Sequence, residues 1–299
     1  MSQPNPDKLP GLGFLLLAAL TLFWGVNFPV MKTILQELPP WTFRTVCLSL
    51  GGLGLLVISR LSGASLTIPR SDLKPLLSSA LFAVTGWHLF SAYGLIHLPA
   101  GRAVIIGYTM PLWASLLGVF ILGERLNYRR TAGLVLGLGG LAVLIGPDLK
   151  ALGDFPLGAG FMVGAAWCWA LGSVLIKRGP WTMPLVLVTA WMFILGGIPV
   201  FVGAFLFENP IVVLDLSRTG ILLLAYAILL PMLFCHWAYF KVVTLFPVSL
   251  ASIRMLAAPI LGVYTGAAFL GEPVGIIELS ALVLVVGGLA VVMIRPGRT

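Results

Sequence analysis

The chain has 299 residues, of which 59% are hydrophobic and only 9% are charged, and its mean hydropathy is +1.06. Soluble domains carry about 25% charged residues, so this composition excludes a soluble protein and indicates an integral membrane protein. The net charge of +8 does not point to nucleic acid, because basic cytoplasmic loops produce such an excess in polytopic membrane proteins.

A helix needs about 20 apolar residues to cross a bilayer core about 30 Å thick. The apolar runs here are continuous and do not alternate, which predicts helices and not a transmembrane barrel. Ten runs are expected to span the membrane: 11–34, 40–60, 74–96, 100–122, 129–146, 156–176, 183–206, 216–240, 248–270 and 274–294. The first exceeds twenty residues and lacks a small-residue cleavage pattern, so we interpret it as a helix and not as a signal peptide. The connections are too short for a soluble domain, so any function is expected within the helices.

The distribution of lysine and arginine between the loops predicts the orientation. With a cytoplasmic N-terminus, twelve basic residues fall on the inner side and four on the outer side, while Arg44 and Arg254 lie near or inside the membrane. Both termini are therefore predicted to be cytoplasmic, in a multi-pass protein of a bacterial-type inner membrane.

The second half of the sequence repeats the first. The segment "MPLWASLLGVFILGERL" from Met110 aligns with "APILGVYTGAAFLGEPV" from Ala258, a shift of 148 residues that matches Pro111 to Pro259 and one Leu-Gly-Glu to the other. The first helices also correspond, at a shift of 145, with "WGVNFPVMK" from Trp24 against "WALGSVLIK" from Trp169.

These shifts predict two repeats, 1–147 and 148–299, with five spans each. An odd number of spans means that the second repeat enters the membrane in the opposite sense. Inverted repeats are typical of secondary transporters, whose substrate site lies near the bilayer midplane between the repeats.

The paired motifs resemble the EamA branch of the drug/metabolite transporter superfamily, over essentially the whole chain. The shared features are five plus five helices, a first helix with Trp-Gly or Trp-Ala that ends in lysine, and the Pro…Leu-Gly-Glu pattern that closes helices four and nine. The resemblance implies a central cavity lined by helices one, three, four, six, eight and nine, with five and ten at the periphery. It also implies export of amino acids or related metabolites, but it does not carry over the substrate.

Ionisable groups inside a membrane are costly and indicate function. All ten carboxylates are predicted in or near loops, which leaves His88 and His236 in the interior of helices three and eight. These two positions are 148 residues apart, so the histidines are equivalent in the two repeats and are expected to face a shared cavity. Three roles stay open for them: contact with the substrate, proton coupling, or a structural bond to a neighbouring carbonyl.

Further residues of the candidate substrate site follow from helical spacing and from the repeat. They are polar or aromatic residues on the predicted inner faces: Trp24, Asn27, Thr85, Ser91, Tyr108, Trp169 and Tyr239.

Pro111 and Pro259 are predicted hinges, because each proline removes a backbone hydrogen bond and frees a carbonyl about four residues earlier, at Gly107 and Met255. Arg254 and Lys241 are candidate charges at the inner mouth, although Arg254 can also snorkel to the lipid headgroups. Glycine clusters in helices five and ten predict close packing, within a monomer or a homodimer.

The sequence thus predicts an all-α secondary transporter that works by alternating access and exports small amphipathic metabolites, such as hydrophobic or aromatic amino acids. The alternatives are an antiporter of phosphorylated or other polar metabolites and a broad-specificity drug exporter. An enzyme is not expected, since there are no intramembrane acid pairs and no HExxH or GxSxG motif, and an ATP-driven pump would need a P-loop. No metal or cofactor is expected, because the three cysteines lie in separate spans without ligand spacing.

Overall fold

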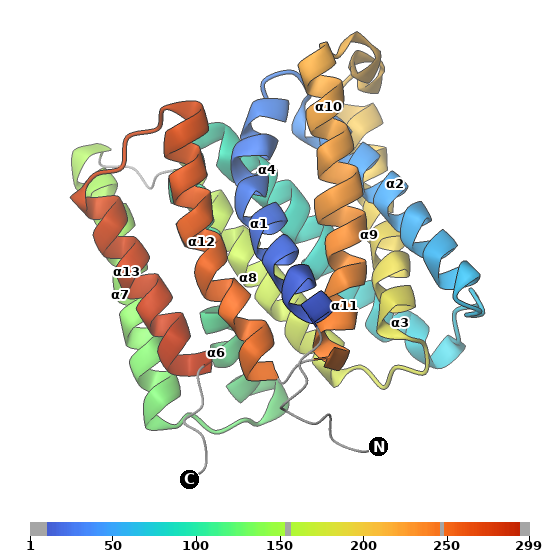
Figure 1. Ribbon diagram of the computed structural model, residues 1–299, viewed down its shortest axis with the longest axis horizontal. Coiled ribbons are helices and arrows are strands. Elements are labelled where there is room, and N and C mark those ends of the chain that lie inside the picture. The colour runs from blue at the N-terminus through green and yellow to red at the C-terminus, as the bar shows by residue number, and fades with distance from the viewer. Residues whose placement is uncertain (1–10, 153–156, 246–247, 294–299) are drawn as a thin grey trace.

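The computed structural model describes residues 11–152, 157–245 and 248–293, and the side chains of these except 148–152, 240–241, 243–245, 248–255 and 293. The prediction of an all-helical fold is confirmed, and Figure 1 shows the helices side by side. The elements are α1 (Gly11–Ile34), α2 (Pro40–Leu61), α3 (Arg70–Ala80), η1 (Leu81–Gly86), α4 (Trp87–His97), α5 (Ala100–Gly107), α6 (Met110–Leu122), α7 (Tyr128–Leu152), α8 (Leu157–Arg178), α9 (Leu185–Phe207), η2 (Pro210–Asp215), α10 (Arg218–Ala227), η3 (Ile228–Phe234), α11 (Cys235–Leu245), α12 (Val248–Leu270) and α13 (Ile276–Met293).

These elements form about ten spans within the described residues. Eight are long and apolar enough to cross a bilayer, and two shorter apolar segments, Leu256–Leu270 and Ile276–Val292, complete the set. The spans begin and end close to the predicted limits, because prolines sit at the helix starts and glycines at the ends.

The repeated Leu-Gly-Glu motif is a helix stop. Gly123 and Gly271 adopt positive φ angles of 67° and 64° directly after α6 and α12. The following glutamates, Glu124 and Glu272, donate from their backbone N–H groups to Gly118 and Gly266 in the preceding turn. This is the Schellman arrangement, in which glycine is favoured because the left-handed conformation is unfavourable for residues with a Cβ atom.

The predicted hinges differ in structure. The fourth span is interrupted at Tyr108 and Thr109, and Pro111 lies in the first turn of α6, where its missing N–H costs no helical hydrogen bond. Pro259 lies inside the continuous helix α12. The repeat predicted equivalent prolines, but only Pro111 coincides with a break in its helix.

Helices of the two predicted repeats alternate in the bundle. The helices α7 and α13 pack along one edge and α2 and α9 lie toward the other, while α1 with α12 and α4 with α8 lie between them (Figure 1). Each of these four pairs joins one helix from each predicted repeat, so the apolar core is built mainly between the repeats. The peripheral place of helices five and ten, which the family resemblance implied, agrees with this arrangement.

Two polar contacts at equivalent positions relate the repeats. Glu37 accepts hydrogen bonds from the backbone N–H and the hydroxyl of Ser217, at 2.9 and 2.8 Å. Asp72 accepts from the backbone N–H and the hydroxyl of Thr182, both at 3.0 Å. A shift of 145 residues carries position 37 to 182 and position 72 to 217. With five spans in each repeat, the two contacts lie at opposite ends of the bundle, which supports an inverted relationship.

Close packing of α7 against α13 explains part of the glycine pattern. A Cβ atom added at Gly288 would lie 2.6 Å from the carbonyl oxygen of Gly133 and 2.8 Å from the nitrogen of Gly137. At the neighbouring Gly287, an added Cβ atom would meet nothing within 4 Å. The glycines at 133, 137 and 288 therefore allow two helices of the same chain to pack closely. Packing within a monomer is one of the two possibilities that the sequence left open, the other being packing within a homodimer.

We expect Gly288→Ala to destabilise the protein by about 1–3 kcal/mol, because the added methyl group would push α13 away from α7. Gly287→Ala is the matched control, since it makes the same chemical change on the adjacent residue in open space. The thermal unfolding midpoint of each purified variant in detergent, compared with that of the wild type, measures its change in stability. Equal midpoints for the two variants would contradict this account of the packing.

Candidate functional site

Both histidine-bearing spans contain a π-helical segment directly before the histidine. In the third span η1 ends two residues before His88, and in the eighth span η3 ends two residues before His236. The π-helical turns occupy equivalent places in the two predicted repeats. Segments of this kind occur frequently at functional sites because they leave backbone groups available for other bonds. Sequence reasoning missed them, and the one local signal was Pro231, which lies inside η3 and whose repeat equivalent is Ala83.

The carbonyl oxygen of Pro231 is a hydrogen-bonding centre beside His236. His236 donates to it from Nδ1 at 2.9 Å, and Trp24 of α1 donates to it from Nε1 at 3.3 Å. The Trp24 ring meets the His236 ring edge-on with centroids 5.6 Å apart, and Tyr239 lies 6.3 Å from Trp24. The structure thus brings together three of the predicted site residues, Trp24, His236 and Tyr239.

The ring of Phe193 in α9 connects the two histidines. Its centroid lies 6.2 Å from that of His88 and 4.9 Å from that of His236, and both contacts are edge-to-face. His88 is buried, with 7% of its surface exposed, and its Nδ1 atom has no hydrogen-bond partner among the described residues. That the two histidines face a shared cavity stays a prediction, and Phe193, which contacts both rings, is a residue that the sequence did not indicate.

The hydroxyl groups near His88 hold helices together. Thr85 donates to the carbonyl of Gly196 in α9 at 2.6 Å. Ser91 donates to the carbonyl of His88 at 3.2 Å and accepts a hydrogen bond from Arg44 at 2.9 Å. In this conformation both predicted site residues therefore make contacts within the protein.

None of the contacts described for the remaining predicted site residues is with His88 or His236. Tyr108 is buried with its ring 6.5 Å from that of Phe28, and Trp169 is half-buried against the main core. Asn27 donates to the sulfur of Met31 at 3.3 Å, and its Oδ1 atom is buried without a partner in the described part of the chain. The side chains of Arg254 and Lys241 lie outside the described residues.

Arg44 of α2 is the residue of this region that sequence reasoning passed over. The sequence placed it near or inside the membrane, and the structure buries it with only 3% of its surface exposed. Its guanidinium donates from Nε to the carbonyl of His88 at 3.0 Å and from Nη2 to Ser91, and its carbon lies 4.9 Å above the Phe43 ring. Burying a charge costs several kcal/mol unless an opposite charge and hydrogen bonds compensate for it.

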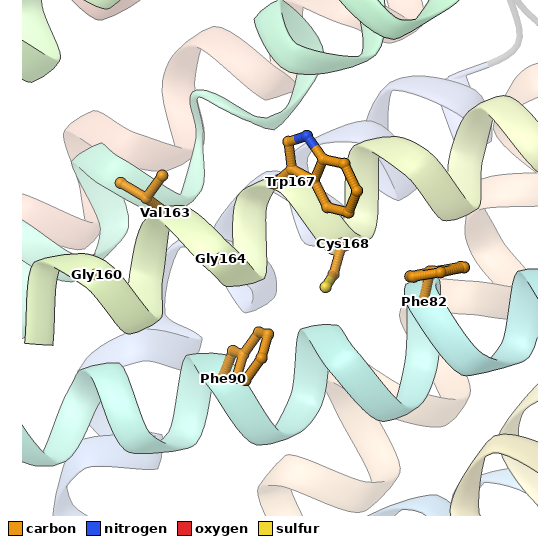
Figure 2. A pocket seen from close by; sticks show the side chains of 7 residues that line it. All are labelled: Phe82, Phe90, Gly160, Val163, Gly164, Trp167 and Cys168. Carbon is orange, nitrogen blue, oxygen red and sulfur yellow. The ribbon is translucent and has the colours of Figure 1, made fainter. Parts of the chain in front are cut away.

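Two open grooves of the molecule lie away from the histidine pair. Figure 2 shows one of about 570 Å³, with Phe82 and Phe90 on one side and Trp167 and Cys168 of α8 on the other. A second groove of about 490 Å³ lies between α1 and α12. Neither groove is lined by His88 or His236, so the central cavity inferred from the sequence stays a prediction. Among the described residues, no group of His, Cys, Asp and Glu side chains has the arrangement of a metal site.

A duplicated bundle of about ten apolar helices, with polar and aromatic groups between its repeats, is the architecture of a multi-pass membrane transporter. The model of the EamA-like transporter family matches residues 11–146 and again residues 156–294. The chain belongs to the EamA-like transporter family, and it is a transporter and not an enzyme.

Relatives of the chain include transporters whose printed names describe a role. The chain is 27% identical over 290 residues to a probable amino-acid metabolite efflux pump of Salmonella typhimurium, covering 93% of each protein. It is 27% identical to the uncharacterized transporter YoaV of Bacillus subtilis, over 91% of this chain and 93% of the relative. It is 26% identical to the uncharacterized inner membrane transporter YedA of Escherichia coli, over 94% of this chain and 90% of the relative.

A solved crystal structure shares the fold. It superposes with a TM-score of 0.67 at 21% sequence identity, and the match covers 94% of this chain and 96% of the other. At this identity the likeness concerns the fold alone.

We expect Trp24→Phe to lower the stability by at least about 1 kcal/mol, because the hydrogen bond to Pro231 is lost and a smaller aromatic ring replaces the indole. Trp167→Phe is the control, since Trp167 is 39% exposed in the groove of Figure 2. Thermal unfolding midpoints in detergent give the comparison. A larger loss in Trp167→Phe would show that the indole nitrogen of Trp24 contributes little.

Proposed function

We propose that this protein is a secondary transporter that works by alternating access and exports small amphipathic metabolites, such as hydrophobic or aromatic amino acids. The observation that carries the proposal is the pair of equivalent histidines on either side of Phe193, between the two predicted repeats. The printed names of two relatives, from Salmonella typhimurium and Escherichia coli, describe probable amino-acid metabolite efflux pumps.

The chemistry of the interior suits a substrate that is both apolar and polar. The aromatic rings of Trp24 and Phe193 contact His236, the Tyr239 ring lies beside Trp24, and the imidazoles add hydrogen-bonding nitrogen atoms. Sites for small molecules combine an apolar lining with a few polar groups that fix orientation. Of the predicted site residues, Asn27, Thr85, Ser91, Tyr108 and Trp169 would complete the site in a conformation with a different arrangement of the helices.

The alternative substrates make different chemical demands. A phosphorylated metabolite needs several lysines or arginines in the cavity, whereas Arg44 is the one cation that hydrogen-bonds to the His88 backbone within the described residues. A drug exporter would accept cations and neutral compounds, for which the aromatic rings suffice. The transport of a mixed panel distinguishes these alternatives from amino-acid export.

Alternating access requires contacts between the repeats to break at one end of the bundle while they form at the other. Glu272 accepts hydrogen bonds from the backbone N–H groups of Ala100 and Gly101, at 2.6 and 2.9 Å, and so holds α5 to the end of α12. At the other end Glu124 pairs with Lys177 at 2.5 Å and with Arg130 at 2.8 Å. The break before Pro111 gives the fourth span a hinge, and Pro259 is proposed as its counterpart.

The pair with Lys177 also fixes the charge of Glu124, which lies outside the spans. The hydrogen bond from Lys177 lowers the pKa of Glu124, so this carboxylate is ionised throughout the neutral range. The stability that it contributes is present above the ordinary glutamate pKa and is lost as the pH falls through the lowered value.

The proposal includes location and orientation. We place the protein in a bacterial-type inner membrane with both termini cytoplasmic, on the strength of the basic loops, and one relative is named an inner membrane transporter. The functional unit is a monomer or a homodimer.

Proteoliposomes containing the purified protein test the proposal with a panel of radiolabelled amino acids, a sugar phosphate and a cationic dye at two pH gradients. We expect His88→Ala and His236→Ala to lower the uptake of a hydrophobic amino acid at least about tenfold, the size expected when a hydrogen bond to a charged substrate is lost. Cys47→Ala, a buried change in α2, is expected to retain most of the activity. Wild-type rates in both histidine variants would remove the pair from the site.

The direction of transport is tested in cells. Expression of an exporter is expected to make cells resistant to toxic analogues of aromatic amino acids, because the analogue leaves the cytoplasm. The growth-inhibitory concentration is compared with that of cells expressing His236→Ala. Greater sensitivity in cells with the wild-type protein would indicate import.

A further inference from the structure

Arg44 is a buried cation that has no acidic partner among the described residues. It is 3% exposed, and its two hydrogen bonds go to a carbonyl oxygen and a hydroxyl group, both of them neutral. Ion pairs elsewhere in the described part of the chain use other basic residues, namely Arg102, Arg130 and Lys177. Buried charges in proteins are normally paired, so this positive charge is available to an anion that is not part of the chain.

Most of the acidic residues that the structure describes are engaged at the helix ends. Glu208, the carboxylate that contacts α2, accepts hydrogen bonds from the backbone N–H groups of Trp41 and Thr42 and from the Thr42 hydroxyl. Glu208 thus caps the first turn of α2. None of the described interactions is an ion pair between Glu208 and Arg44. The region of His88 is therefore positively charged within the part of the chain that the structure describes.

The second observation is the unpartnered nitrogen of His88. Nδ1 of His236 donates to the carbonyl five residues earlier, in the π-helical segment. The repeat equivalent of that carbonyl belongs to Ala83, yet Nδ1 of the buried His88 has no partner in the described residues. A buried polar atom without a hydrogen bond is costly, and this one belongs to the residue whose carbonyl anchors Arg44.

We propose that Arg44 and Nδ1 of His88 bind the carboxylate of the transported molecule. With Nε and one N–H of Nη2 engaged by His88 and Ser91, the guanidinium of Arg44 still offers the N–H donors of its Nη1 and Nη2 end to the two oxygens of a carboxylate. A neutral imidazole with its proton on Nδ1 donates to the same group. The Phe193 ring, in contact with His88, receives the apolar part of the molecule. The site is thus specific for a monocarboxylate with an aromatic or aliphatic body, an inference that rests on the proposed function.

The same geometry assigns no role to the amino group of the substrate. No described acidic side chain contacts His88 or Arg44, and the groups that the structure places around them are aromatic rings, carbonyl oxygens and a hydroxyl group. We therefore expect aromatic carboxylic acids without an amino group to bind as well as the amino acids. Amines and esters without a free carboxylate are expected to bind poorly.

The competing explanation gives Arg44 a structural role only. Its bonds to His88 and Ser91 join α2 to α4, and its contact with Phe43 adds a cation–π interaction. This explanation accounts for burial but predicts no preference for carboxylates. The two accounts differ in ligand selectivity, which a loss of stability alone does not change.

The experiment measures competition and binding with four compounds that share one aromatic body. The uptake of radiolabelled L-phenylalanine into proteoliposomes is competed with 3-phenylpropionate, L-phenylalanine methyl ester and phenethylamine. In parallel, the shift of the thermal midpoint of the purified protein with each of the four compounds reports binding without transport. Wild-type protein is expected to prefer the two carboxylates over the ester and the amine at least about tenfold.

The variants separate charge from structure. Arg44→Gln is expected to lose this preference, and Arg44→Lys is expected to keep a reduced preference because the charge stays and the paired donors are lost. Arg60→Gln is the matched control, an exposed arginine at the other end of α2. If Arg44→Gln does not fold, the comparison of Arg44→Lys with the wild type gives the test.

The outcomes are distinct. In one outcome the wild type prefers carboxylates while Arg44→Gln shows the same preference, or Arg44→Lys shows it undiminished. Either result overturns the assignment of Arg44 and does not affect the proposal of amino-acid transport. Binding of 3-phenylpropionate that depends on Arg44, without phenylalanine transport, supports the carboxylate site and refutes the proposed function. Equal binding of all four compounds, or of none, refutes the carboxylate site.

Discussion

The first turn of every helix carries backbone N–H groups without a partner inside the helix, and in this protein acids of the opposite predicted repeat satisfy several of them. Glu208 caps α2 and Glu272 caps α5, while Glu37 and Asp72 hold the residues that precede α10 and α9. The bundle is therefore closed at its ends by contacts between the repeats. These acids lie at the helix ends, and the interior near His88 contains the buried cation Arg44 and no described carboxylate that contacts it.

Most of the fold could be predicted from the sequence. Apolar length alone located the spans, since a bilayer requires about 20 apolar residues per helix, and the Leu-Gly-Glu pairs exposed the repeat. The local course of the helices could not be predicted, because the change from α to π hydrogen bonding in η1 and η3 leaves hydrophobicity unchanged. The proline pattern did not show that the two positions differ locally, since Pro259 lies within a continuous helix and Pro111 adjoins a break.

The candidate site was predictable only in part. The spacing of His88 and His236 identified the two residues that meet across one aromatic ring. Phe193 and Arg44 were missed because each looks ordinary in its own helix, a phenylalanine in an apolar run and an arginine close to a helix start. Their significance depends on which side chain of another span they face, and helical periodicity does not determine that.

The two predicted repeats differ in the hydrogen bonds around their equivalent histidines. His236 donates from Nδ1 to the carbonyl of Pro231, whereas Nδ1 of His88 has no partner among the described residues, and the backbone oxygen of His88 binds the buried Arg44. Two positions that are equivalent in the sequence repeat thus have different polar surroundings. If the proposed carboxylate site is correct, this difference would orient the substrate within the bundle.

The π-helical segments also bear on the history of the chain. A π turn arises when one residue is inserted into an α-helix, and an insertion of this kind displaces every residue that follows it by one position around the helix. Both third helices of the predicted repeats carry the segment before a histidine, and the alignment between them continues at the same shift. A single ancestral five-helix unit with this segment and this histidine would account for both copies without two separate insertions.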